Sequence, residues 1–329
     1  MTFLQELPVP EWAALVPLAL ALGVVMYLTL LGLAVVPHVP AAPPLPGDLE
    51  LLATPSVMVP AALLYLLGWM VRRRRIPELF WEGGNVGVRA IAAGLLALLA
   101  IPEAGVAGKA AAALGTGAAA GLLQLLRLGW ITLDHQSGIV PARRWIQKLG
   151  ADTGALGLVW LTLLSPGPAA LLAGVVLVAL AAGGGPAYRA GRLSLVALVG
   201  LFRVAAGRSG WRHHRAIPSR VARRVRSGHL DGEAEIRAAP AALLRRDGGR
   251  SFQDGWLVAS AEGPWFLPRS GRAREGFPLA HRGIGVPIRS PLLTEVELRD
   301  PGGDMILMVP VGGPGPEELA GVFERYENL

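Results

Sequence analysis

The first lysine or arginine of this chain is Arg72, and an apolar run without any charge lies before it at residues 14–36. A bilayer core of about 30 Å needs about 20 apolar residues in a helix, so this run is long enough to cross a membrane. It is too long for the apolar part of a cleaved signal peptide, and acidic residues precede it where a signal peptide has basic ones. We therefore expect a retained first membrane helix.

The composition agrees with a membrane protein. Of the 329 residues, 52% are hydrophobic and 17% are charged, whereas soluble domains carry about 25% charged residues. The length suits a membrane domain plus one further module. Because the chain has no cysteine, disulfides, thiol nucleophiles and thiolate metal sites are excluded.

Five more apolar runs follow the first. They occupy residues 53–71, 86–101, 110–131, 154–165 and 168–184. The last two are short and could form a hairpin instead of two full spans. The prediction is an α-helical polytopic membrane domain of about six spans.

The basic residues predict the orientation of these spans. They cluster at residues 72–75, 143–148 and 189–226, and lysine and arginine near span ends mark the cytoplasmic side. Six crossings put all three clusters on one side, with Lys109 as an exception. We expect a multi-pass protein of the bacterial inner membrane with both termini in the cytoplasm.

Residues 187–207 have an amphipathic pattern, which predicts a helix in the cytoplasmic interface; a seventh span is the alternative. A basic linker follows, up to residue 228. Anionic lipid headgroups are the expected partners of this linker and of the first basic cluster, because lipid is nearer than nucleic acid to a tethered segment. The arginines expected to contact lipid are Arg72, Arg73, Arg74, Arg75, Arg220, Arg223, Arg224 and Arg226.

From residue 229 the chain changes to short apolar runs separated by glycine, proline and charge. "GWLVAS", "PWFLPR", "TEVELRD" and "DMILMVPV" are typical of strands, and the tail from Pro316 predicts an amphipathic helix. The chain thus divides into a membrane domain at 1–186, an amphipathic helix and linker at 187–228, and a cytoplasmic, mostly-β domain at 229–329 that ends in one helix.

Two resemblances extend this division. Residues 14–184 resemble the bacterial membrane family catalogued as domain of unknown function 4126. The matching residues are Leu52–Pro55, the Ile76–Pro77 step, and Val88, Arg89, Ala92 or Ala93, and Gly94. The chain departs from that family where an acidic–lysine pair is replaced by four arginines, and the family implies no activity. The C-terminal part resembles pleckstrin-homology-like modules, which implies binding of lipids or of a protein partner.

Five polar residues fall within or beside the predicted spans: Asn85, Arg89, Gln124, Arg127 and Asp152. A charge inside a span costs a few kcal/mol and usually faces protein or water. Arg89 could therefore belong to a pathway or headgroup site, form a structural ion pair, or extend to the interface. We expect Asp152 as its partner, with Glu82 as the alternative. Gly117 and Gly121 predict close helix packing, within one chain rather than between two.

No set of residues predicts catalysis. Asp134, His135 and Ser137 are too close in sequence to converge as a triad, His213 and His214 are adjacent and suit one metal ion poorly, and the glycines at 183–185 lack the residues of a P-loop. We therefore expect a non-enzymatic protein without metal or cofactor that binds or scaffolds, as part of a larger membrane complex. The alternative is a transporter of small solutes or lipids that uses the intramembrane polar residues.

The topology can be tested with reporter fusions. Fusions after residues 75, 140 and 329 should give a cytoplasmic signal and a fusion after residue 45 an extracytoplasmic one, because the basic clusters must share one side. An extracytoplasmic signal at residue 75 or 329 would contradict the prediction.

Overall fold

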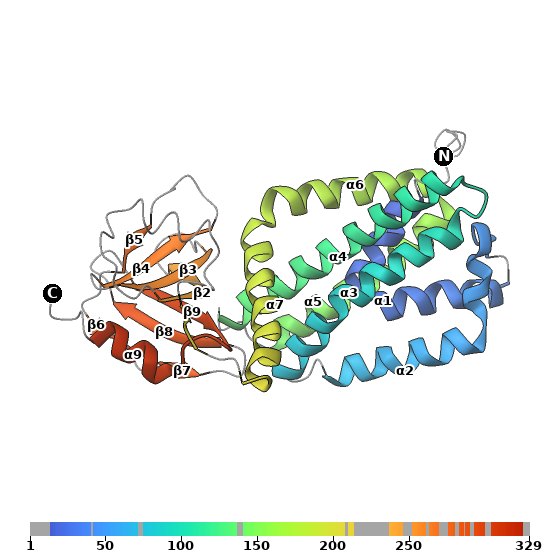
Figure 1. Ribbon diagram of the computed structural model, residues 1–329. Helices are drawn as coiled ribbons and strands as arrows, with labels where there is room; N and C mark the ends of the chain where they lie inside the picture. Colours follow the sequence, from blue (N-terminus) through green and yellow to red (C-terminus); the bar gives the residue numbers. More distant parts are fainter. Residues whose placement is uncertain are drawn as a thin grey trace. The chain divides into compact units, whose positions relative to one another are not determined.

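A computed structural model of the chain divides into two compact units, Met1–Ala187 and Tyr188–Leu329. We call them the helical unit and the sheet unit, and describe each by itself (Figure 1). The described residues are 14–40, 42–71, 75–136, 141–207, 210–213, 237–245, 252–260, 263–269, 276–279, 283–285, 287–289, 293–299 and 304–324.

The helical unit consists of long helices joined by short connections. Its elements are α1 (Leu15–Val35), the 3₁₀ helices η2 (Val36–His38) and η3 (Gly47–Ala53), α2 (Pro55–Val71), α3 (Arg75–Ala100), α4 (Val106–Gln136), α5 (Pro141–Leu164) and α6 (Pro166–Gly183).

Helix α1 is the centre of this unit. It is apolar on every side, as expected of a helix surrounded by others, and it packs against α2, α3, α4, α5 and α6. Leu18, Leu22 and Leu33 are fully buried, and they form one core with Ala93 and Ala97 of α3. The most apolar segment of the chain is thus the one that the other helices enclose.

Four helices among the described residues are long and apolar enough to cross a membrane. They are Leu15–His38, Pro77–Ala100, Val106–Leu133 and Pro166–Gly183. A fifth results if the pair Gly47–Ala53 and Pro55–Val71, bent by 70°, counts as one broken span. The structure therefore agrees with a helical membrane protein but does not confirm six spans. Helix α5 is not among the candidates, because its first half is rich in charge.

Two predicted boundaries were wrong. The third apolar run was expected to begin at residue 86, but α3 begins at Arg75 and includes the polar segment before the run. The connection expected between the apolar runs at 110–131 and 154–165 is largely helical in its described residues, since α4 continues to Gln136 and α5 starts at Pro141. The added segment of α3 carries Glu78 and Glu82, which are buried and paired with basic side chains.

The sheet unit contains one antiparallel sheet of nine described strands. The strands are β1 (Arg212–His213), β2 (Arg237–Arg245), β3 (Phe252–Ser260), β4 (Gly263–Pro268), β5 (Phe277–Pro278), β6 (Gly283–Ile284), β7 (Ile288–Arg289), β8 (Leu293–Arg299) and β9 (Met305–Pro310). Their order is β5-β4-β3-β2-β9-β8-β6, with β1 on β2 and β7 on β8.

Two helices complete the sheet unit: α7 (Gly185–Ala205), which belongs to it from Tyr188 onward, and α9 (Pro316–Glu324). Leu319 and Phe323 of α9 are fully buried in one core with Phe266 and Leu307 of the sheet. The predicted sheet domain with a final helix is therefore confirmed. The helix expected at 187–207 is α7, which is not among the candidate spans.

Helices α3 and α4 approach closely through glycine. A Cβ at Gly117 would lie 2.8 Å from the carbonyl oxygen of Ala90, and one at Gly121 would lie 3.3 Å from the Ala90 Cβ. Both glycines of the "GAAAG" motif thus face α3 of the same chain, where small residues let helix backbones come together.

This contact leads to a prediction with a matched control. Gly117→Ala should lower the melting temperature in detergent, since forcing an extra methyl into a packed contact costs about 1–3 kcal/mol. Gly115→Ala, on the same helix, has nothing within 4 Å of the added Cβ and should be neutral or stabilising. Equal effects of the two changes would contradict the packing role of Gly117.

A buried polar cluster at a break in helix α1

Helix α1 is interrupted at Val25, whose backbone is extended (φ −142°, ψ 74°). An α-helix pairs each carbonyl with the N–H four residues ahead, and this break disturbs that pairing for the preceding carbonyls of Gly23 and Val24. In a helix that crosses a membrane no water is available, so such groups must bond to other parts of the protein. The break therefore needs donors from neighbouring helices.

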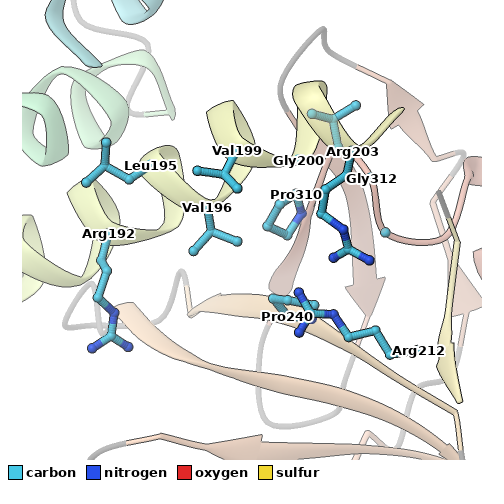
Figure 2. A pocket seen from close by; sticks show the side chains of 12 residues that line it. Arg192, Leu195, Val196, Val199, Gly200, Arg203, Arg212, Pro240, Pro310 and Gly312 are labelled. Atoms are coloured by element: carbon cyan, nitrogen blue, oxygen red, sulfur yellow. The ribbon is translucent and has the colours of Figure 1, made fainter. Parts of the chain in front are cut away.

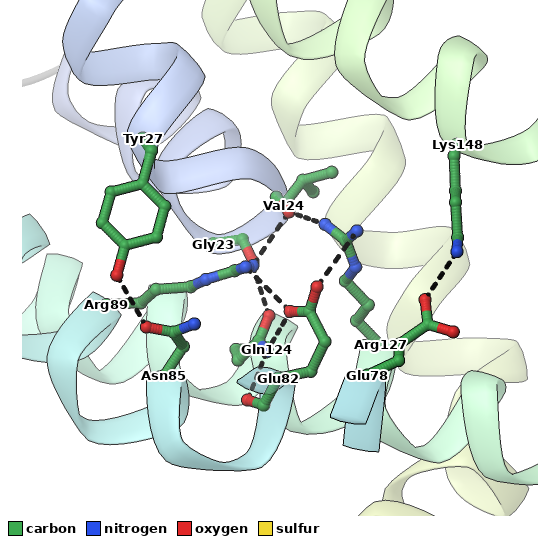
Figure 3. Close-up of polar contacts among 10 residues, drawn as sticks. All are labelled: Gly23, Val24, Tyr27, Glu78, Glu82, Asn85, Arg89, Gln124, Arg127 and Lys148. Carbon is green, nitrogen blue, oxygen red and sulfur yellow. Dashed lines mark hydrogen bonds and ion pairs between the residues drawn. The ribbon is translucent and has the colours of Figure 1, made fainter. Parts of the chain in front are cut away.

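Arg89 of α3 supplies the first donors (Figure 3). Its Nη1 donates to the carbonyl oxygens of Gly23 and Val24, both at 2.8 Å. The side chain is 0% exposed, although arginine is the bulkiest of the fully buried residues. The carbonyl end of a helix carries partial negative charge, so a guanidinium at the end of the first half of α1 is favourably placed.

Arg127 of α4 reaches the same break from another helix. Its Nη1 donates to the Val24 carbonyl oxygen, and its Nη2 lies 3.5 Å from Oε1 of Glu82. Two guanidinium groups from α3 and α4 thus meet at one interrupted turn of α1.

Glu82 supplies a negative charge beside these two guanidinium groups. It lies two helical turns before Arg89 on α3, on the same face, and its Oε2 is 2.8 Å from the Arg89 Nη2. Gln124 joins the groups, because its Nε2 donates to the Glu82 Oε2 at 2.8 Å and to the Glu82 carbonyl at 2.7 Å. Its Oε1 accepts from Arg89. We call Glu82, Arg89, Gln124 and Arg127 the break cluster.

Two further pairs flank the break cluster. The Tyr27 hydroxyl, just beyond the break, donates to Oδ1 of Asn85 at 2.9 Å. Toward the start of α3, Lys148 Nζ lies 2.9 Å from Oε1 of Glu78 and ties α5 to α3. Buried polar groups are stable only when bonded, and these contacts join four helices through side chains.

Four of the five predicted intramembrane residues, Asn85, Arg89, Gln124 and Arg127, lie at this break. Asp152 does not: its Oδ2 accepts from the Tyr65 hydroxyl of α2 at 2.9 Å, and the partner of Arg89 is Glu82. The preference for Asp152 was therefore wrong and the alternative was right. Tyr27 and the pair of Lys148 and Glu78 were missed, although a tyrosine in an otherwise apolar run was a usable signal.

Other predicted residues lie outside the part of the chain that can be described. Arg72, Arg73, Arg74, Arg220, Arg223, Arg224 and Arg226 are among them, and Arg75 is described only as the first residue of α3. Within the described ranges, no group of three histidine, aspartate or glutamate side chains could hold a metal ion.

The break cluster suits structural support better than chemistry. Its side chains come from α3 and α4, and they bond to each other and to carbonyls of α1. An interrupted helix in a transporter uses its exposed carbonyls to coordinate a cation. Here the guanidinium groups of Arg89 and Arg127 already occupy that position.

The ion pair of Arg89 and Glu82 can be tested by a double-mutant cycle. Arg89→Gln and Glu82→Gln should each be strongly destabilising, by about 3–5 kcal/mol, because the first removes the closer of two partners of a buried carboxylate and the second leaves the buried Arg89 without its counter-charge. The double variant should lose about 1–3 kcal/mol less than the sum of the single losses. Melting of the four proteins in detergent measures this coupling.

Asp152→Asn provides the control, since it shares no partner with Arg89 in the contacts above and should combine additively with Arg89→Gln. Arg89→Lys should be only partly tolerated, because the single ammonium group of lysine cannot replace the planar guanidinium group that contacts α1, α4 and Glu82 together. Additive losses for Arg89 and Glu82 would contradict the coupling.

No family model, curated protein or solved structure matched this chain in the three comparisons with known proteins. The resemblances drawn from the sequence motifs stay predictions.

Proposed function

We propose that this is a non-enzymatic membrane protein in which the helical unit acts as an anchor and the sheet unit binds a ligand or a protein partner. It would serve as a binding or scaffolding subunit of a larger membrane complex. We place it in the bacterial inner membrane with both termini in the cytoplasm, following the distribution of basic residues.

The observation that carries this proposal is the buried ion pair inside the break cluster. Arg89 and Glu82 both have side chains that are 0% exposed, and they pair at 2.8 Å. A path for a solute needs polar groups that face water and can exchange partners. Groups that bond to one another and to the backbone of α1 instead hold helices together.

A cavity beside the break supports the same interpretation. It touches Val24 and has a volume of about 300 Å³. Its lining comes from α1, α5 and α6, and none of these described residues is charged or carries a polar side chain: Leu20, Ala21, Val24, Ala151, Gly154, Ala155, Leu158, Leu172, Ala173 and Val176. A hydrated solute would lose its water there without compensation.

A transporter is the second candidate, because α1 is interrupted within a segment long enough to cross a membrane. Discontinuous helices of this kind line the substrate sites of many transporters. The two functions differ in whether water reaches the break from either side of the membrane.

The absence of cysteine makes this difference measurable by cysteine labelling. Thr29→Cys and Asn85→Cys place a thiol at buried positions beside the break. In vesicles open to reagent on both sides, we expect neither to react with a charged, membrane-impermeant methanethiosulfonate within the time that a surface thiol reacts completely.

Glu103→Cys is the matched control, since residue 103 is exposed in the connection between α3 and α4. Labelling after denaturation would verify that every introduced thiol is present. Reaction of Thr29→Cys or Asn85→Cys at a rate close to that of Glu103→Cys would contradict the anchor and favour the transporter.

A further inference from the structure

The sheet unit contains a pocket of about 250 Å³ between α7 and the sheet. Arginine side chains stand around an otherwise apolar lining (Figure 2). The lining residues come from α7, from β1, from Pro240 of β2 and from the end of β9 with its following turn.

The floor of the pocket is an opening in the sheet. Strands β2 and β9 pair from Arg245↔Met305 to Ala242↔Met308, and the same register continued by two residues would set Pro240 opposite Pro310. Neither proline has an N–H to donate, so the ladder ends there. Strand β1 pairs with β2 only from Ala238 outward, which leaves the edge of β2 at Pro240 uncovered.

Two glycines bring α7 against this opening. A side chain at Gly200 would collide with the carbonyl oxygen of Val311, and a Cβ at Gly312 would lie 2.8 Å from the Gly200 oxygen. Gly312 also has φ +85°, a conformation that other residues rarely adopt. The close approach of the turn after β9 to α7 closes one end of the pocket.

The arginines of this region have two different roles. Arg189 donates to the Phe252 carbonyl oxygen at 2.9 Å, and Arg192 pairs with Asp254, so both fasten α7 to β3. Arg203 and Arg212 have no acidic partner among the described residues. Figure 2 shows their guanidinium groups turned toward each other near Pro240.

The two guanidinium groups are close enough to interact unfavourably. Burial lowers the pKa of Arg212, and the positive charge of Arg203 lowers it further. Arginine side chains are effectively always protonated in proteins. Arg212 also stacks on Trp256, with 5.3 Å between the guanidinium carbon and the ring centroid, so its head is held in place. Two like charges fixed side by side are stabilised by an anion between them.

The rest of the pocket is suited to hydrocarbon. Leu195, Val196 and Val199 of α7 contribute apolar walls, and Val199 is 59% exposed. Phe202, beside Arg203 in sequence, is 77% exposed. This apolar wall continues into exposed apolar side chains, so a hydrocarbon chain of a ligand could extend along it and out of the pocket.

We propose that this pocket binds an amphiphilic phosphate, with a phosphate monoester held between Arg203 and Arg212 and an attached hydrocarbon chain along Val196 and Val199. This deepens the proposed binding function by assigning a ligand class to the sheet unit. Arginine suits phosphate because its planar fork donates two parallel hydrogen bonds.

Calorimetric titration of the full chain in phosphatidylcholine nanodiscs tests the proposal. The probe is the short-chain, water-soluble dihexanoyl phosphatidic acid, and the references are inorganic phosphate and dihexanoyl phosphatidylcholine. We expect saturable binding of the phosphatidic acid that is at least tenfold tighter than binding of either reference.

Arg203→Gln combined with Arg212→Gln should weaken binding of the probe about tenfold or more, because two charge-assisted contacts are lost. Arg269→Gln combined with Arg299→Gln removes the same net charge from exposed positions and should leave binding unchanged. Val199→Trp fills the apolar side without changing charge and should also weaken binding. An unchanged melting temperature of each variant would show that it is folded.

Nanodiscs that contain long-chain phosphatidic acid distinguish the source of the ligand. Loss of probe binding in these discs assigns the pocket to a bilayer lipid, and retained binding assigns it to a soluble amphiphile; both results support an amphiphilic phosphate. Absence of probe binding, equally tight binding of inorganic phosphate, or equal affinity after the Arg203 and Arg212 changes would overturn the proposal. None of these results affects cysteine labelling at the α1 break, so the two proposals can fail separately.

Discussion

A backbone group that loses its partner away from water must find another, and the helical unit is organised around this requirement. Val25 interrupts α1 at the centre of the bundle, and Arg89 and Arg127 donate to the carbonyls left before the break. Their charge in turn requires Glu82, because a buried cation without a counter-charge is strongly unfavourable. The break at Val25 is thus the place where side chains of α3 and α4 bind to α1.

The sheet unit also contains an interruption of backbone pairing, but this one leaves no backbone donor without a partner. The ladder of β2 and β9 stops where Pro240 and Pro310 would face each other, and no donor is lost because proline has none. Arg203 and Arg212 lie beside this opening, and no acidic partner for them is found within the described ranges. In the helical unit charged side chains of the same chain complete the interruption, whereas in the sheet unit we propose that an anionic ligand binds beside it.

The arginines of α7 show that a positive charge in the sequence does not identify the group that it binds. The amphipathic pattern of residues 187–207 predicted a helix in the cytoplasmic interface, and it did not indicate that Arg189 and Arg192 bind a carbonyl and a carboxylate of β3. Strand β2 was not predicted from the sequence, because its alanines and Pro240 have low strand propensity. Its neighbours β3 and β9 make it a central strand through pairing that no local pattern indicates.

The sequence by itself determined the apolar runs, the retained first helix as an expectation, the strand-rich C-terminal part and the helix from Pro316, since each depends on the composition or periodicity of a short segment. It also identified four polar residues that are costly within a membrane helix and therefore usually face protein or water. They are Asn85, Arg89, Gln124 and Arg127. Only the tertiary structure decided that Glu82 and not Asp152 pairs with Arg89, that α1 breaks at Val25, and that Arg203 meets Arg212 over Pro240. Glu82 lies only seven residues before Arg89 on α3, but which neighbouring helices surround Arg89, and whether Asp152 of α5 comes close to it, follows from packing, which a local pattern does not contain.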